Sequence, residues 1–191
     1  MLLLAKLTPL AFLTILIPVY WRHYGPSNFL WLSDLGLFCT VLAIVLESPL
    51  LASMPAVGIL ALELAWTADF IAGGRLLGLA GYMFDAGYPL YLRLLSLFHV
   101  AIPPVVLLLL YRWGYDGRAL PLQVLLTWAA FAGAYLLTPP EKNINWVFGP
   151  GTEPQTAIPA LLYFLIMCVV VPLFVLVPTH FLLSWLFPPA R

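Results

Sequence analysis

Apolar residues along this chain gather in six long runs that are separated by short polar segments. A helix needs about 20 consecutive apolar residues to cross the hydrocarbon core of a bilayer. Runs of this kind predict six transmembrane helices, over residues 2–20, 28–46, 49–71, 89–112, 119–138 and 158–187. The last run would be ~45 Å long as a helix, and Pro172 and Pro178 are expected to kink it.

Aromatic residues stand at the ends of several runs. Tyr20 and Trp21 close the first, and Tyr111 and Trp113 close the fourth, as in the aromatic belts of membrane proteins. No small-x-small cleavage site follows the first run, so we expect it to remain as a helix. The pattern predicts an all-α fold, a polytopic transmembrane bundle in which residues 1–191 form a single integral membrane domain.

The composition agrees with this class. Of the 191 residues, 63% are hydrophobic and only 8% are charged, whereas a soluble domain carries about 25% charged residues. The formal net charge is zero, which gives no electrostatic reason to expect nucleic acid as a partner. Cys39 and Cys168 lie inside apolar runs and are interpreted as small buried hydrophobic residues.

The distribution of cations and loops bears on orientation. We call the end of the bundle where the first run begins side A, and the opposite end side B. Cations near side A are Lys6, Arg112, Arg118 and Arg191, and those near side B are Arg22, Arg75, Arg93 and Lys142. This even balance leaves the positive-inside rule undecided. The longer side-B loops favour a cytoplasmic side A, with both chain termini there, in a bacterial inner membrane.

The segment 72–88 is rich in glycine and half apolar. One interpretation is that it lies in the membrane interface or re-enters the bundle. The other is a loose loop.

Ionisable residues inside the runs are the candidates for function, since each costs several kcal/mol unless it is paired or hydrated. They are Asp34, Glu63, Asp69, Arg93, His99 and His180. Counting residues from the helix ends places the first five in the side-B half of the membrane. His180 falls in the side-A half.

Two runs carry polar or aromatic residues at three-residue intervals, which places them on one helix face. The stripes are Glu63, Trp66 and Asp69 in the third run, and Arg93, Ser96 and His99 in the fourth. Acids facing an Arg/Ser/His stripe would form a polar intramembrane pocket. A buried salt-bridge network that fixes helix register is the structural alternative.

Roles in such a pocket follow from side-chain chemistry. Arg93 is expected to neutralise Asp34 or Glu63. His99 is the candidate general base, and Ser96 supplies a hydrogen-bonding hydroxyl or a nucleophile.

Two further segments carry candidate ligand-binding residues. Asn143, Asn145 and Trp146 follow the fifth run on side B, where amides and an indole suit a polar head group; a capped turn with an interfacial tryptophan is the alternative. His180 either satisfies carbonyls freed by Pro178 or serves as a ligand. The three histidines form no HxxxH or HxxH pair, so neither a metal nor a cofactor is expected.

The stretch from Ser96 to Pro103, continued by Tyr111-Arg112-Trp113, resembles a helix of the androgen-induced-gene-type integral membrane hydrolases. The stretch from Asn28 to Asp34 is similar to that family's nucleophile-bearing helix start. The resemblance implies a six-helix intramembrane enzyme that cleaves lipid esters with a threonine nucleophile and a histidine. His99 matches that histidine, but Trp31 stands where the threonine belongs.

The chain also resembles a group of bacterial membrane proteins that carry an NINWVFG-type segment and a PTH segment. That resemblance implies no function. Three hypotheses therefore stand: a pocket that binds, and in one version modifies, a lipid or other amphiphile; a small transporter or proton-coupled carrier; and a non-enzymatic membrane subunit or assembly factor. Membrane lipids are expected partners, while a partner protein or a homo-oligomer is left open.

Overall fold

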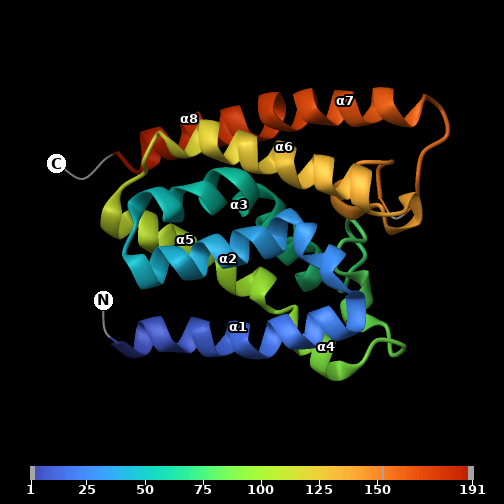
Figure 1. Cartoon of the computed structure of the whole chain (residues 1–191). Helices are drawn as coiled ribbons and strands as arrows, with labels where there is room; N and C mark the ends of the chain where they lie inside the picture. Colours follow the sequence, from blue (N-terminus) through green and yellow to red (C-terminus); the bar gives the residue numbers. More distant parts are fainter. Residues whose placement is uncertain (1–2, 152, 189–191) are drawn as a thin grey trace.

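The computed structural model describes residues 3–151 and 153–188, and within them every regular element is a helix. Six helical rods pack along one another, and α1 begins at the end of the bundle where α8 ends (Figure 1). The predicted all-α bundle is therefore confirmed. Residue 2, where the first run was expected to begin, and Arg191, counted among the side-A cations, lie outside the described residues.

Four of the rods are continuous α-helices, namely α1 (Leu3–Tyr24), α2 (Leu32–Leu46), α3 (Pro49–Ile71) and α6 (Ala119–Leu137). The fourth rod along the chain consists of α4 (Leu90–Leu95) and α5 (Phe98–Trp113). The last rod consists of α7 (Ala160–Val171), a π-helical segment at Pro172–Leu176 and α8 (Val177–Leu186). Four 3₁₀ turns cover Pro26–Leu30 (η1), Gly81–Phe84 (η2), Pro140–Lys142 (η3) and Ile144–Trp146 (η4).

Five rods are long and apolar enough to cross a membrane, and α2 is the shorter one. The 15 residues of α2 span ~22 Å, against a hydrocarbon core of about 30 Å. This helix begins at Leu32 rather than at residue 28, because Pro26 starts a 3₁₀ turn and Trp31 is extended. The amide of Asn145 accepts from Leu32 N and donates to Leu30 O, which holds this break in place.

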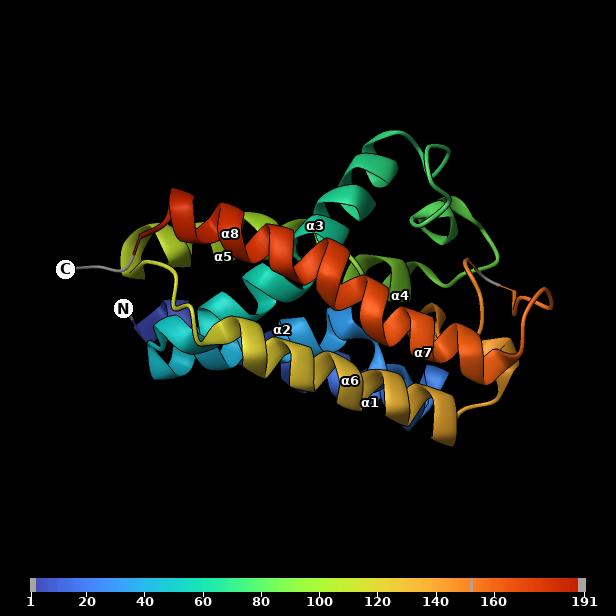
Figure 2. The ribbon, with the colours of Figure 1, turned by 90° about the horizontal axis from the view of Figure 1, so that it is seen from above.

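Helix α3 lies at the centre of the bundle, in contact with α2, α5 and α6 (Figure 2). Small residues allow this close packing, since a bilayer provides little hydrophobic drive between helices. A Cβ added at Gly36 of α2 would overlap Ile59 of α3, and one added at Gly58 would overlap Gln123 of α6. The outer rods α1 and α7–α8 leave most of their surface facing outward.

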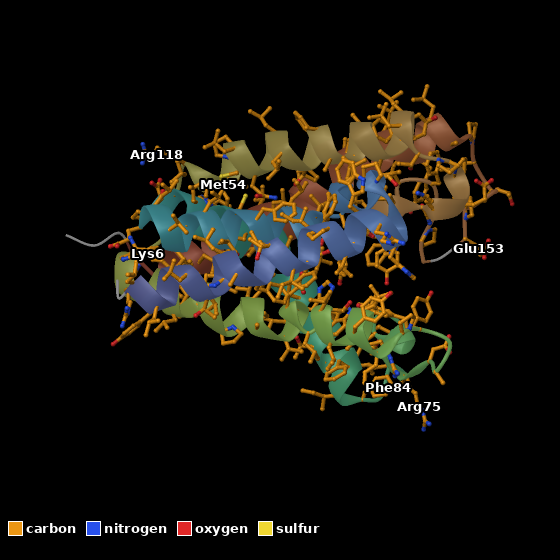
Figure 3. All side chains as sticks on the ribbon, turned by 60° about the horizontal axis from the view of Figure 1, so that its bottom comes forward. Lys6, Met54, Arg75, Phe84, Arg118 and Glu153 are labelled. Atoms are coloured by element: carbon orange, nitrogen blue, oxygen red, sulfur yellow. The ribbon has the colours of Figure 1, made fainter. Side chains whose placement is uncertain are left out.

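Charged side chains mark the two ends of the bundle. Figure 3 shows Lys6 and Arg118 at side A, and Arg75 and Glu153 at side B. At side A, Lys6 pairs with Glu47 at 2.6 Å, which ties α1 to the turn between α2 and α3.

The fourth rod is interrupted at Ser96 and Leu97, within the span expected to be continuous. Here the backbone turns tighten: Leu97 N donates to Leu94 O, and His99 N donates to Ser96 O. Pro103 and Pro104 follow inside α5. Because the ring of a proline crowds the carbonyl four residues before it, their effect falls on His99 and Val100, after the break. The break positions His99 at the start of α5.

The segment 72–88 is folded against the side-B end of α3. The Asp69 carboxylate accepts four backbone hydrogen bonds, at 2.7–3.3 Å. The donors are the N–H groups of Leu76, Leu77, Gly78 and Ala80. Turn η2 then packs beside Trp66, with Phe84 stacked on Phe70 at 5.5 Å. A loose loop is therefore the wrong interpretation: an aspartate inside α3 organises this segment.

Candidate functional site

The centre of the candidate site is a pair formed by Glu63 of α3 and His99 of α5. Glu63 Oε2 lies 2.7 Å from His99 Nδ1, and only 2% of the Glu63 side chain is exposed. An ionised carboxylate can only accept, so Nδ1 donates and Nε2 of a neutral ring keeps its lone pair. Nε2 makes no hydrogen bond within the described residues. The pair thus holds an oriented imidazole with its outer nitrogen available.

Aromatic rings fix the plane of the His99 side chain. Trp66, one turn from Glu63, stacks on it with centroids 4.6 Å apart and planes inclined by 21°. Phe98 lies on it at 4.1 Å. The imidazole is 14% exposed, and the apolar side chains of Leu97 and Val100 pack against the neighbouring cluster around Trp66.

Ser96 belongs to the same region but does not bond to His99. Its hydroxyl donates to Leu92 O at 3.1 Å and lies 2.9 Å from the Tyr20 hydroxyl. Since a serine has one proton, Tyr20 is the donor in the second contact. Ser96 therefore joins α1 to the interrupted rod, and a role as a nucleophile activated by His99 finds no support in this geometry.

Arg93 does not form the expected ion pair. Its Nη1 donates to Met83 O at 3.1 Å, and the ion pairs among the described residues do not include it. Its buried Nε lacks a hydrogen bond there. The reason is position: Arg93 lies on α4, before the break, and extends toward the 72–88 segment. His99 takes the place beside Glu63 that Arg93 was expected to fill.

Asp34, in the first turn of α2, is a second buried acid with 2% exposure. Its Oδ2 accepts from Asn28 Nδ2 at 2.9 Å, while Oδ1 is buried without a partner among the described residues. Glu63 and Tyr20 lie within its electrostatic reach. Asp34, Glu63, Ser96 and His99 therefore belong to the same part of the bundle.

The remaining acid of the α3 stripe serves the backbone. Asp69 is fully buried, and its two oxygens are occupied by the four N–H groups of the 72–88 segment. It closes one side of the site by holding η2 against Trp66, but presents no free oxygen to a ligand.

The two asparagines after α6 also bind backbone. Asn143 accepts from Phe148 N and donates to Gly149 O, which shapes the loop. Asn145 bridges Leu30 and Leu32, as described above. Both asparagines and Trp146 have positive φ, from 38° to 58°. Of the two interpretations of this segment, the organised turn accounts for the amide contacts.

His180 lies apart from this region, in the side-A half as predicted. Its Nδ1 is 2.9 Å from the hydroxyl of Tyr115, a buried residue whose N–H donates to Phe187 O. This contact ties α8 to the turn after α5. In the structure, His180 therefore connects α8 to the segment that follows α5.

Sequence reasoning missed three residues that complete the polar region: Tyr20, Asn28 and Lys142. Tyr20 resembles any interfacial tyrosine in the sequence, and its contact with Ser96 spans 76 positions. Asn28 is six residues before Asp34, and the two side chains meet only because the chain turns between them. The sequence pattern did not indicate that turn. Lys142 was counted only as a loop cation.

By length and composition of its helices, the chain belongs to the class of multi-pass helical membrane proteins. Comparisons with known protein families, curated proteins and solved structures found no match to it. Within residues 3–151 and 153–188, no three His, Cys, Asp or Glu side chains gather as they would around a metal ion.

Proposed function

We propose that the protein binds a lipid or other amphiphile in the side-B half of the bundle, and that His99 exchanges a proton with the bound molecule. The observation that carries this proposal is the buried Glu63–His99 pair, whose outer ring nitrogen is unpaired among the described residues. A carboxylate on Nδ1 fixes the tautomer and orientation of the ring, as a general base requires. With Ser96 engaged elsewhere, the proton donor is water or a hydroxyl of the ligand.

The surroundings of His99 favour an amphiphile over a water-soluble ligand. The ring borders a small apolar cluster around Trp66, Ala80 and Met83, with Val100 packed against it. A molecule that reaches Nε2 must therefore have an apolar part, while Asp34, Glu63 and the Tyr20 hydroxyl suit a polar part.

The test is native mass spectrometry of gently purified protein, with identification of every lipid that is retained. We expect one amphiphile enriched over bulk phospholipid in the wild type and in His180→Gln, the matched histidine variant of the other half. Glu63→Ala should lose it. Bulk phospholipid alone in all three proteins would refute the site and favour a subunit that docks a partner.

The acid–base role is tested separately with the retained amphiphile as substrate. Wild-type protein should convert it to a product, and His99→Gln should retain the amphiphile without conversion. Product formation by His99→Gln at the wild-type rate would exclude His99 from the chemistry.

A proton-coupled carrier is the second candidate, and the unpartnered Oδ1 of Asp34 favours it. Ionisable residues inside a membrane commonly mark ion or proton pathways, and Glu63 and His99 belong to the same region. This hypothesis predicts flux into liposomes that depends on a pH gradient and is lost in Asp34→Asn and Glu63→Gln. Equal flux with and without the gradient would rule it out.

We further propose that side A faces the cytoplasm of a bacterial inner membrane, on the basis of its shorter connections. A variant without Cys39 and Cys168 allows single cysteines to be placed at Asp85 on side B and Arg118 on side A. A membrane-impermeant maleimide added to intact spheroplasts should label the first and spare the second. The reverse pattern would invert the orientation.

A further inference from the structure

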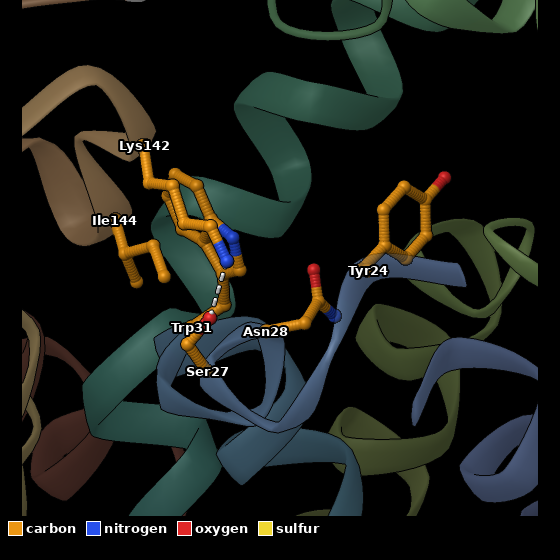
Figure 4. A pocket seen from close by; sticks show the side chains of 6 residues that line it. All are labelled: Tyr24, Ser27, Asn28, Trp31, Lys142 and Ile144. Atoms are coloured by element: carbon orange, nitrogen blue, oxygen red, sulfur yellow. Dashed lines mark hydrogen bonds between the residues drawn. The ribbon is translucent and has the colours of Figure 1, made fainter. Parts of the chain in front are cut away.

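A hollow of about 180 Å³ opens at side B between η1 and the loop after α6. Its walls are Tyr24, Ser27, Asn28, Trp31, Lys142 and Ile144 (Figure 4). This volume is comparable with the ~150 Å³ cavity that can hold a benzene molecule. Tyrosine and tryptophan are the residue types that gather at the level of lipid head groups. The hollow therefore has the size and location to take a small polar group at the membrane surface.

The charge of the hollow comes from Lys142. Its Nζ donates one proton to Ser27 Oγ at 2.8 Å, and an ammonium group has protons left for further acceptors. Among the described residues no carboxylate forms an ion pair with it. The charge of Lys142 is therefore not neutralised by a carboxylate of the described residues.

Two residues with neutral donors also line the hollow: Trp31, and Tyr24 on the side away from Lys142 (Figure 4). The indole N–H of Trp31 and the hydroxyl of Tyr24 make no hydrogen bond within the described ranges. A full positive charge accompanied by N–H and O–H donors is the set that binds anionic oxygen atoms.

Asn28 forms the floor of the hollow and links it to the buried site. A carboxylate only accepts, so the Asn28 nitrogen faces Asp34 Oδ2 at 2.9 Å, and the amide oxygen points into the hollow (Figure 4). The amide separates the Asp34 carboxylate from a bound anion. An acceptor beside the donors suits a ligand that also carries hydroxyl groups.

We propose that this hollow binds the phosphate of a lipid head group through Lys142 and Trp31, with Tyr24 as the opposite wall. A free phosphate offers the same anionic oxygens, but the interfacial setting favours the lipid. The inference rests on the proposed function and deepens it, because it gives the amphiphile an anionic head group. The Asn28–Asp34 contact then connects the head-group site with the Glu63–His99 region.

The experiment uses delipidated full-length protein in a neutral detergent, with phosphatidylglycerol as the probe. Diacylglycerol with the same chains lacks the phosphate and is the comparison ligand. Tryptophan fluorescence and native mass spectrometry report binding to the wild type, Lys142→Ala, Lys142→Arg and Arg22→Ala. Arg22 is the matched control, an exposed cation on the same side that does not line the hollow.

We expect phosphatidylglycerol to bind the wild type and Arg22→Ala alike, and to bind Lys142→Ala about tenfold more weakly. Lys142→Arg should keep most of the affinity. Diacylglycerol that binds the wild type as tightly as phosphatidylglycerol would overturn the proposal without any variant. Equal phosphatidylglycerol affinity of wild type and Lys142→Ala would overturn it as well.

Inorganic phosphate separates the two sources of the anion. Displacement of phosphatidylglycerol by millimolar phosphate would show that the site also takes free phosphate, and absence of displacement would assign it to lipid; both support the shared chemistry. Failure of the acid–base proposal would be seen as conversion of the ligand by His99→Gln, whereas failure of the head-group site would be seen as unchanged phosphatidylglycerol binding by Lys142→Ala.

Discussion

Glu63 Oε2 lies 2.7 Å from His99 Nδ1, and this pair joins α3 and α5 inside the bundle. When one partner of a buried pair is removed, the other is left without compensation, at a cost of about 3–5 kcal/mol. Replacing both by apolar residues is often close to neutral. We therefore expect His99→Leu to lower the melting temperature in detergent, and Glu63→Leu/His99→Leu to recover much of the loss. A double variant that is less stable than either single variant would contradict this account.

The Asp69 carboxylate uses both of its oxygens on the 72–88 segment. Asparagine keeps only one acceptor and would present its NH₂ group to a backbone N–H. Asp69→Asn should therefore increase amide hydrogen exchange at Leu76, Leu77 and Ala80. Asp85→Asn is the control, since Asp85 is exposed and accepts one hydrogen bond, from Gly87. Unchanged exchange in Asp69→Asn would show that the segment holds its fold without the carboxylate.

Asp116, in the side-A turn before α6, gives the stability a pH dependence. Hydrogen bonds from the Arg118 guanidinium lower the pKa of this carboxyl. A lowered pKa stabilises the fold above the ordinary aspartate value of about 3.9, and this contribution is lost as the pH falls through the lowered value. Arg118 is largely exposed, so solvent screens the ion pair and its contribution to stability is small. The melting-temperature difference between wild type and Asp116→Asn should shrink from pH 7 to pH 3. A difference that grows on acidification would reverse the assigned sign.

Gly58 brings α3 close to α6. A Cβ at this position would lie 2.9 Å from Gln123 Cγ, and the buried Gln123 donates to Thr127 Oγ1 at 3.4 Å. Because Gln123 cannot move without losing that bond, we expect Gly58→Ala to cost about 1–3 kcal/mol. Gly117→Ala, where the nearest atom is His180 Cε1 at 3.8 Å, should be nearly neutral. Thermal unfolding of both variants checks the contrast, and equal stability would mean that Gln123 adapts freely.

Asn145 holds the start of α2 through two hydrogen bonds to backbone. Asn145→Ala loses both, for a net cost of about 1–3 kcal/mol. Glu141→Gln, an exposed change in the same loop, should leave the melting temperature unchanged. If Asn145→Ala is instead as stable as the wild type but loses a retained amphiphile, the amide binds ligand rather than backbone.

The sequence alone predicts the rods well, because runs of apolar residues report directly on what a bilayer requires. Proximity of Asp34, Glu63 and His99 could also be predicted, since depth follows from counting residues along each helix. The identity of His99 as the partner of Glu63 could not be predicted. Arg93 and His99 would share a face of an unbroken helix, and the break at Ser96 separates their environments.

Local backbone contacts were equally hidden. Asp69, Asn143 and Asn145 have the chemistry of ligand-binding residues, yet each satisfies N–H or C=O groups of an irregular segment. Such segments must satisfy their backbone groups internally near a membrane. Residue type does not distinguish an amide that binds a ligand from one that closes a turn. The conformation of the loop determines which groups the amide contacts.

The shortness of α2 has a mechanical consequence for the surrounding bilayer. A hydrophobic stretch shorter than the hydrocarbon core creates a mismatch that lipids relieve by thinning locally. With ~22 Å of helix between Leu32 and Leu46, and the polar turn η1 at its side-B end, we expect the head-group layer beside α2 to be drawn inward. Asp34 would then lie closer to water than its place in a full-length span implies, and the lipids around the bundle would form an uneven annulus that is thinnest along this rod.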